Sequence, residues 1–363
     1  MNVQSLESLG WTPFFEAQFD PTRDAELTPA RVSEEQRGSY QILGQSGAWR
    51  AELAGRLRHE MAGDRSQAPC TGDWVLARVP PVREDGSPAL IHRVLMRRTK
   101  FSRKEAGDRT AEQIIAANVD TIFLVQSLNL NLNPRRLERY LALLWESGAE
   151  PVVVLSKADL CADPDPSVEV AKTAARGVTV LVTSALAPGG LDVLAPYLGV
   201  GRTVALVGSS GVGKSTIVNR LLGSDLMRVQ GIREDDRGRH TTTSRQLILL
   251  PGGGMLLDTP GMRTVLMWEG EEGLKTAFQD IEELAARCRF RDCGHGTEPG
   301  CAVQSALETG TLDAGRFANY RKVGREIRHE AMKTDVRLRL EENRRWRRIH
   351  MAQRKRPDKR KIR

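Results

Sequence analysis

GSSGVGKS, residues 208–215, is the stretch of sequence that decides the fold of this chain. It fits the pattern G-x-x-x-x-G-K-[ST], with Gly208, Gly213, Lys214 and Ser215 at the required positions. The apolar run TVALV precedes it, and TIVNRLL, with apolar residues at helical spacing, follows it. A strand, a glycine-rich turn and a helix in this order are typical of a phosphate-binding loop.

The glycines let the backbone curl so that its N–H groups point inward around a phosphate at the start of a helix. We expect Lys214 to neutralise the β- and γ-phosphate oxygens as a catalytic residue, and the Ser215 hydroxyl to bind Mg²⁺. The residues expected to contact nucleotide here are Gly208, Ser209, Ser210, Gly211, Val212, Gly213, Lys214, Ser215 and Thr216.

Downstream, the apolar run GMLLD ends at Asp258 and continues as Thr259-Pro260-Gly261. An aspartate at the end of a strand beside a phosphate loop can hold Mg²⁺ through water, and the N–H of Gly261 can reach the γ-phosphate. The polar stretch 231–244, GIREDDRGRHTTTS, lies between the two motifs. It is typical of a switch loop in which a threonine, here Thr242 in preference to its neighbours, binds Mg²⁺. An ordinary surface loop is the alternative.

Upstream, Ser156-Lys157-Ala158-Asp159 follows the apolar run PVVVL and is similar to a base-reading loop. The carboxylate of Asp159 can accept hydrogen bonds from N1–H and the exocyclic amine of guanine, a pattern that adenine lacks. Lys157 would lie along the base. Ser184-Ala185, after the run VTVLV, fits a loop whose backbone contacts the guanine oxygen. The sequence therefore favours GTP, with a P-loop ATPase as the alternative.

The order of these motifs is unusual, because the base-reading loop precedes the phosphate loop and in an ordinary GTPase it comes last. A circular permutation explains the order, since chain termini can move to a surface loop while the packed sheet stays the same. Apolar runs alternate with helix-like stretches over residues 111–268. This alternation predicts a multidomain α/β protein with a circularly permuted P-loop GTPase domain in that range.

The flanking segments differ in composition from the central domain. Short strand-like runs separated by Gly, Pro and Asp fill residues 38–110 and predict an all-β barrel or sandwich, preceded by an extension over 1–37. Residues 269–330 are helical and charged except for one cluster. Three thiolates and one imidazole would complete a tetrahedral, structural Zn²⁺ site, with metal-free buried cysteines as the alternative. These ligands are Cys288, Cys293, His295 and Cys301.

The net charge of +8 is concentrated in a basic tail over 331–363, where residues 344–363 alone hold eleven Lys and Arg against one acid and contribute +10. The rest of the chain therefore carries about −2. Such a tail suits a polyphosphate partner, or else is simply solvated. No apolar run approaches the ~18 residues that span a bilayer, and the start lacks the pattern of a secretory signal. We expect a cytoplasmic protein with no membrane partner.

The motifs together resemble a known family, the bacterial ribosome small-subunit-dependent GTPase A group (RsgA, also called YjeQ). The resemblance rests on Thr71-Gly72-Asp73-Trp74-Val75, on S-K-A-D, T-S-A, G-S-S-G-V-G-K-S, G-R-H-T-T-T and D-T-P-G in this order, and on the cysteine cluster. It implies an N-terminal OB-fold, a permuted GTPase domain and a C-terminal zinc domain. It also implies late maturation of the small ribosomal subunit, rRNA binding, and stimulation of the GTPase by the subunit. We expect a monomer that binds GTP or GDP with Mg²⁺.

The group that positions the hydrolytic water is not obvious from the motifs. Met262 follows Gly261, where many GTPases have a glutamine that orients water. We hypothesise that His240 or a group on the ribosome supplies this catalytic function, while an exposed loop histidine without a role is the alternative. A protein of another class, an RNA-binding scaffold in which nucleotide is only a conformational switch, also fits these motifs.

Overall fold

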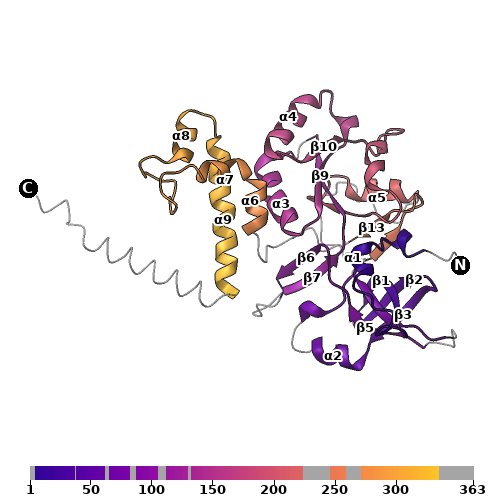
Figure 1. Cartoon of the computed structure of the whole chain (residues 1–363). Helices are drawn as coiled ribbons and strands as arrows, with labels where there is room; N and C mark the ends of the chain where they lie inside the picture. The colour runs from indigo at the N-terminus through magenta and orange to yellow at the C-terminus, as the bar shows by residue number, and fades with distance from the viewer. Residues whose placement is uncertain are drawn as a thin grey trace, which may run out of the picture.

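The computed structural model describes residues 5–36, 38–61, 65–81, 87–104, 112–129, 132–223, 246–258 and 271–334. Three parts can be followed in Figure 1: a small barrel, a sheet flanked by helices, and a helical group that ends in α9. Among the described helices, none combines the length and the apolar character needed to cross a bilayer. His240, Thr242, Gly261 and Met262 lie outside the described residues, as do residues 335–363 of the basic tail.

The N-terminal part is a closed five-stranded barrel. Its strand order is β1-β2-β3-β5-β4, with β4 pairing back onto β1, and only β3 and β5 run parallel. A helix connects the third and fourth strands, and the resulting OB-like topology confirms the expected β module. The elements are β1 (Thr28–Gln36), β2 (Ser39–Gly44), β3 (Gly47–Leu53), α2 (Gly55–Met61), β4 (Trp74–Arg78) and β5 (Ala89–Val94).

The barrel begins earlier than the expected boundary at residue 38, because β1 lies within the segment assigned to an extension. Ala30 and Val32 of this strand are buried in the barrel core. Its sequence, TPARVSEEQ, contains a proline and several charges, so it lacks the apolar alternation that marks a strand. Pairing with β2 and β4, rather than local pattern, makes it a strand.

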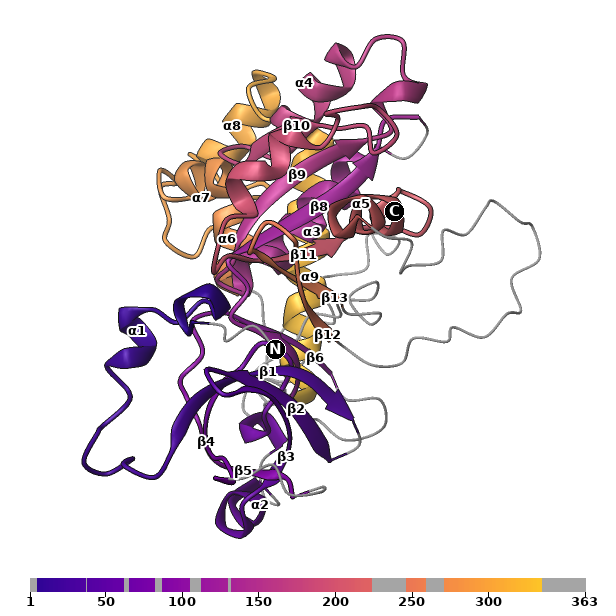
Figure 2. The ribbon, with the colours of Figure 1, turned by 90° about the vertical axis from the view of Figure 1, so that its right-hand side faces the viewer.

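The segment before the barrel is also packed. It contains η1 (Glu7–Leu9) and α1 (Pro13–Glu16), which Figure 2 shows beside the junction of the barrel and the larger sheet. The rings of Trp11 and Phe15 lie 4.8 and 5.8 Å from the buried ring of Trp74. Trp74 therefore anchors the N-terminal segment to the barrel, and the motif T-G-D-W-V has a packing role.

The central part contains the predicted parallel sheet. Its strand order is β10-β9-β8-β11-β13-β12, and all neighbours are parallel except β12, which runs antiparallel to β13. The strands are β8 (Thr121–Ser127), β9 (Glu150–Ser156), β10 (Thr179–Val182), β11 (Thr203–Val207), β12 (Gln246–Leu249) and β13 (Met255–Asp258). A separate hairpin, β6 (Lys100–Lys104) and β7 (Glu112–Ala117), leads into this sheet.

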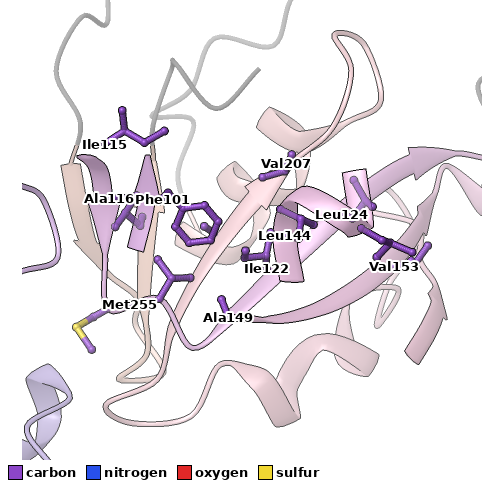
Figure 3. Close-up of a cluster of buried hydrophobic side chains, with 14 of the residues drawn as sticks. Phe101, Ile115, Ala116, Ile122, Leu124, Leu144, Ala149, Val153, Val207 and Met255 are labelled. Carbon is purple, nitrogen blue, oxygen red and sulfur yellow. The ribbon is translucent and has the colours of Figure 1, made fainter. Parts of the chain in front are cut away.

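Both faces of the sheet are covered, which explains the near-continuous apolar runs of its strands. One face packs on α3 (Pro134–Glu146) and α4 (Asp165–Ala174), and the other on η4 (Asp192–Tyr197) and α5 (Lys214–Leu222). Figure 3 shows the first face, where Leu124, Leu144 and Val153 lie in one buried cluster. The short η3 (Ala158–Leu160) follows β9.

The C-terminal helices are α6 (Glu271–Ala277), α7 (Gln279–Ala285), α8 (Ala302–Glu308) and α9 (Ala314–Thr334). They pack against α3 so closely that a Cβ atom added at Gly273 would lie 2.0 Å from the carbonyl oxygen of Ala142. The carboxylate of Glu138 on α3, only 1% exposed, accepts hydrogen bonds from Arg316 and Asn319 of α9. Arg316 also forms an ion pair with Asp280 of α7. A buried ionic cluster thus joins this part to the central sheet.

The barrel and the central sheet meet at Arg31, a residue of β1 that is 1% exposed. Its guanidinium donates to the carbonyl oxygens of Leu9 (2.5 Å), Gly72 (3.2 Å) and Asn118 (2.8 Å). Burial lowers the pKa of Arg31 to about 10. Each acceptor comes from a different segment, so one side chain connects the N-terminal segment, the barrel and the entrance to β8.

Candidate nucleotide site and metal centre

The glycine-rich loop connects β11 to α5, as the sequence predicts for a phosphate loop. Gly208, Gly211 and Gly213 have φ of 149°, 77° and 98°, a region that side chains disfavour. A Cβ atom added at Gly208 would lie 2.3 Å from the carbonyl oxygen of Val125 in β8. The loop therefore needs glycine both for its backbone angles and for its close approach to the neighbouring strand.

Lys214 begins α5, and its amino group folds back over the loop. Its Nζ donates to the carbonyl oxygens of Gly208 (2.7 Å) and Ser209 (2.6 Å). Val212, a residue of the loop, is fully buried, while Ser215 and Thr216 are partly exposed in the first turn of the helix. The amino group of Lys214 and the hydroxyl groups of Ser215 and Thr216 therefore lie together at the start of α5. This arrangement suits a chain of phosphates and its cation.

The S-K-A-D motif begins at Ser156, the last residue of β9, and contacts the phosphate loop. The hydroxyl oxygen of Ser156 lies 2.5 Å from the carbonyl oxygen of Val212 and 3.1 Å from that of Gln126. A hydroxyl has one hydrogen, so it donates to one of these acceptors at a time. Lys157 has a left-handed φ of 61°, and its Cε would lie 3.9 Å from a Cβ atom added at Gly213.

The T-S-A loop after β10 completes the base-reading region. The hydroxyl of Ser184 donates to the exposed carboxylate of Asp159 at 2.5 Å, and the N–H of Ala158 donates to the carbonyl of Thr183. Ala185, the next residue, is partly buried. The structure therefore joins the two loops that the sequence assigned to the base, with the carboxylate held by a neighbouring hydroxyl.

The motifs converge because parallel strands end at the same edge of a sheet, where ligands of such folds bind. β9, β10, β11 and β13 run parallel in that sheet, with β8 between β9 and β11, so their following loops share one edge. Asp258 is the last residue of β13 and pairs through its backbone with Gln246. The side chain of Asp258, with His240, Thr242 and Gly261, lies outside the described residues.

One residue beside the site was missed by the sequence analysis. Gln126 lies at the end of β8, is fully buried, and has no hydrogen-bond partner for its amide among the described residues. Its backbone carbonyl oxygen is one of the two acceptors within hydrogen-bond distance of the Ser156 hydroxyl. The available signal was an amide side chain directly after the apolar residues Ile122–Val125.

The Cys/His cluster lies between α7 and α8 and forms one compact group. The four potential ligand atoms all lie within 4.8 Å of one another. Nδ1 of His295 is 3.6 Å from Sγ of both Cys288 and Cys301, and these two sulfurs are 3.8 Å apart. With Cys293, they could hold a metal ion.

The loop that carries these ligands is held by its own polar contacts. His295 has a left-handed φ of 53°, and the N–H groups on either side of it, from Gly294 and Gly296, donate to the carboxylate of Glu298. The amide of Gln304 donates to the carbonyl of His295 at 2.6 Å. Burial opposes ionisation of Cys288, but hydrogen bonds from the backbone N–H groups after Cys301 outweigh it and lower its pKa. At Cys293 a backbone hydrogen bond from His295 lowers the pKa, but burial and hydrogen bonds with Cys301 and Cys288 outweigh it and raise the pKa to about 11. Without a metal, the surroundings therefore favour the thiolate at Cys288 and not at Cys293.

Comparison with known proteins agrees with this geometry. A family model described as RsgA GTPase matches residues 94–268. A protein from Opitutus terrae named "Small ribosomal subunit biogenesis GTPase RsgA" is 44% identical over 359 residues, which cover 97% of this chain and 98% of that protein. The chain belongs to the RsgA GTPase family. A second RsgA, from Streptomyces avermitilis, is 47% identical over 94% of this chain and 91% of its own length.

Solved structures support the RsgA fold as well. The crystal structure of YjeQ from Thermotoga maritima aligns with a TM-score of 0.62 and 25% identity, over 83% of this chain and 98% of that one. YloQ, described as a circularly permuted GTPase, aligns with a TM-score of 0.59 and 26% identity, over 84% and 96%. The family resemblance and the permuted GTPase fold inferred from motif order are therefore confirmed.

Proposed function

We propose that this RsgA-family chain hydrolyses GTP as a late maturation factor of the small ribosomal subunit, with its hydrolysis stimulated by that subunit and its rRNA. The names of its relatives support a role in small-subunit biogenesis, and the arrangement of the nucleotide site supports GTP hydrolysis. The observation that carries the proposal is the contact of Ser156 with the phosphate loop, together with the bond of Ser184 to Asp159. A cytoplasmic location and a monomeric state belong to the same proposal.

In this proposal the described residues perform binding and positioning. The N–H groups of residues 208–216 surround the phosphates, and Lys214 exchanges its carbonyl partners for the β- and γ-phosphate oxygens. Ser215, Thr242 and Asp258 would hold Mg²⁺, which would neutralise phosphate charge when bound. Gly261 contributes an N–H to the γ-phosphate.

Base selection follows from the carboxylate of Asp159. Its contact with the Ser184 hydroxyl favours one orientation of the carboxylate, in which it can accept from N1–H and the exocyclic amine of guanine. Lys157 packs beside Gly213 and extends its methylenes along the base, and the backbone at Ala185 meets the guanine oxygen. Competition between GDP and ADP tests this step, and equal affinities would identify a P-loop ATPase.

Hydrolysis also needs a positioned water, for which Met262 offers no suitable group. We assign this role to His240 or to a group on the ribosomal subunit, so unaided turnover should be slow. Substituting His240→Ala should abolish stimulated turnover while GTP binding survives. Unchanged turnover would remove His240 from the mechanism.

The Cys/His cluster is proposed to hold one structural Zn²⁺. Tetrahedral zinc, with Zn–S of about 2.3 Å and Zn–N of about 2.0 Å, separates two sulfurs by about 3.8 Å and sulfur from nitrogen by about 3.5 Å. The corresponding distances among Cys288, His295 and Cys301 are 3.8 and 3.6 Å. Four protein ligands leave no open position, which supports a structural role.

Single-turnover GTP hydrolysis with purified small ribosomal subunits, and separately with naked rRNA, tests the proposed function. The proposal expects acceleration by the intact subunit, measured against a Lys214→Ala variant as the inactive control. Nucleotide binding without acceleration would favour the alternative, an RNA-binding scaffold in which GTP is only a conformational switch.

A further inference from the structure

An aromatic ring is exposed on the metal-binding loop, within a segment rich in arginines. Phe290 is 42% exposed, and it is the one large apolar side chain exposed among the described residues 271–334. Arg287, Arg289 and Arg291, close to it in the sequence, are exposed, and the guanidinium of Arg289 lies 5.6 Å from the centre of the Phe290 ring. Within the described residues these three side chains form no ion pair.

The loop holds these side chains in a defined conformation. The N–H of Arg289 donates to the carbonyl of Gly300, and the N–H of Cys293 donates to the carbonyl of Phe290. Gly300 has a left-handed φ of 75°, and a Cβ atom added there would lie 3.1 Å from Cβ of Arg289. Because the segment is held at both ends by the Cys/His cluster, Phe290 is presented to solvent with little conformational freedom to lose on binding.

Positive charge continues from the loop onto α9. The ring of Phe317 lies 6.4 Å from that of His295, and the guanidinium of Arg321 lies 5.8 Å from the centre of the Phe317 ring. Arg325 donates to the backbone of Arg321 one turn earlier. Of the acids near the loop, Asp292 is exposed and Glu298 is engaged by backbone N–H groups. Among these named residues, five arginines stand against two acids.

We infer that this surface binds single-stranded RNA, with Phe290 stacked on one unpaired base and the three loop arginines on the flanking phosphates. The inference rests on the proposed function, in which rRNA is a partner, and adds where and in what form it is contacted. An exposed aromatic ring in an arginine-rich segment suits unpaired nucleotides, because every base has a stacking face and each phosphate accepts bidentate hydrogen bonds.

A protein partner fits the same surface less well. Protein interfaces need a contiguous apolar centre, and Phe290 has no exposed large apolar neighbour in the described part of these helices. Duplex RNA fits less well too, because its bases are already stacked and its contacts are mainly to phosphate and sugar. Measured affinities for unpaired and duplex RNA therefore decide whether unpaired RNA, duplex RNA or protein binds this surface.

The test uses the full, zinc-loaded chain and fluorescence anisotropy with a short labelled unpaired RNA, compared with a blunt-ended RNA duplex of the same length. Phe290→Leu keeps an apolar side chain but removes the stacking face, and should weaken binding of the unpaired RNA about tenfold. Phe290→Trp should bind at least as well as the unaltered chain. Neither substitution should change duplex binding, and equal zinc content should confirm an intact loop.

The arginines are tested through salt dependence. The double substitution Arg287→Gln and Arg291→Gln should reduce the slope of log affinity against log salt by about 1.4, since each phosphate contact on a single strand contributes about 0.7. The matched control, Lys172→Gln with Lys275→Gln, removes the same charge from exposed positions on α4 and α6 and should leave the slope within about 0.3 of the parent value.

Two results would overturn the inference: unchanged affinity of Phe290→Leu for unpaired RNA, or equal loss of slope in the lysine control. If the Phe290→Leu variant lost association with the small subunit but kept RNA affinity, the contact would be to protein and the inference would also be wrong. Failure of the unaltered chain to hydrolyse GTP faster with subunits rejects the proposed function instead, so the two failures can be told apart.

Discussion

The hydroxyl oxygen of Ser156 lies 2.5 Å from the carbonyl oxygen of Val212, so the loop after β9 is joined directly to the phosphate loop. Many GTPases have an asparagine at this position, and serine makes the connection with one hydroxyl instead of an amide. The two halves of the nucleotide site are therefore connected in spite of their reversed order along the chain.

Ser156→Ala should weaken GDP binding by about 2- to 10-fold, because a hydrogen bond of this kind contributes about 0.5–1.5 kcal/mol and Val212 would lose its donor. Ser156→Asn, which restores a donor, should recover most of the affinity. Isothermal titration calorimetry measures both, with Thr173→Ala on the exposed side of α4 as a control. Equal affinity of the alanine variant would show that the connection does not support the site.

Glu138→Ala should destabilise the chain by about 3–5 kcal/mol, because it leaves the buried guanidinium of Arg316 without one of its carboxylates. Urea unfolding followed by circular dichroism measures the change. Glu169→Ala, which breaks an exposed pair with Lys172 on α4, should cost less than about 1 kcal/mol. Similar losses in the two variants would mean that burial of the ionic cluster is unimportant.

The same cluster predicts a pH dependence through Asp280. Burial raises the pKa of Asp280, but the hydrogen bonds and charge of Arg316, with the charge of Arg176, outweigh burial and lower it. Since the folded pKa lies below the unfolded value of about 3.9, the stabilisation is present above that pH and is lost as the pH falls below it.

Asp280→Asn should therefore be less stable than the parent at neutral pH, and the difference should shrink as the pH falls below about 4. Urea midpoints measured from neutral to acid pH provide the comparison, with Asp163→Asn on an exposed loop as the control. A constant difference across that range would contradict the assignment.

Removal of the metal should loosen the C-terminal helices. Their core contains few buried apolar residues, including Phe278, Val303 and Phe317, so a metal that crosslinks the loop should supply much of their local stability. Chelation or Cys293→Ser should abolish bound zinc and raise amide hydrogen exchange in residues 288–308. Cys161→Ser, outside the cluster, should change neither, and retained protection after chelation would exclude a structural metal.

Gly72→Ala should destabilise the barrel by about 2–4 kcal/mol, because its φ is 94° and the new Cβ atom would lie 2.1 Å from the carbonyl oxygen of Ala117. Gly38→Ala provides a close control, since its φ is 91° and open space surrounds it. Gly38→Ala should lower the free energy of unfolding by only about 1 kcal/mol. Thermal unfolding compares them, and equal losses would show that the close approach to Ala117 adds nothing.

The sequence by itself determined the features that depend on consecutive residues. The phosphate loop can be predicted from sequence because eight consecutive residues, with a strand before and a helix after, supply both the backbone angles and the hydrogen-bond donors that bind a phosphate. The Cys/His cluster is readable for a similar reason, since its four ligands lie within fourteen residues. Continuous apolar runs separated by helical stretches predicted the covered parallel sheet.

Only the tertiary structure decided the features that join distant segments. Strand β1 carries no strand pattern and is formed by pairing, and Arg31 finds its acceptors in three other segments. The partner of Ser156 lies 56 residues away, and that of Glu138 lies 178 residues away. Local sequence specifies backbone conformation and apolar pattern, whereas buried polar groups must be paired by whatever the fold brings near, and that depends on the whole chain.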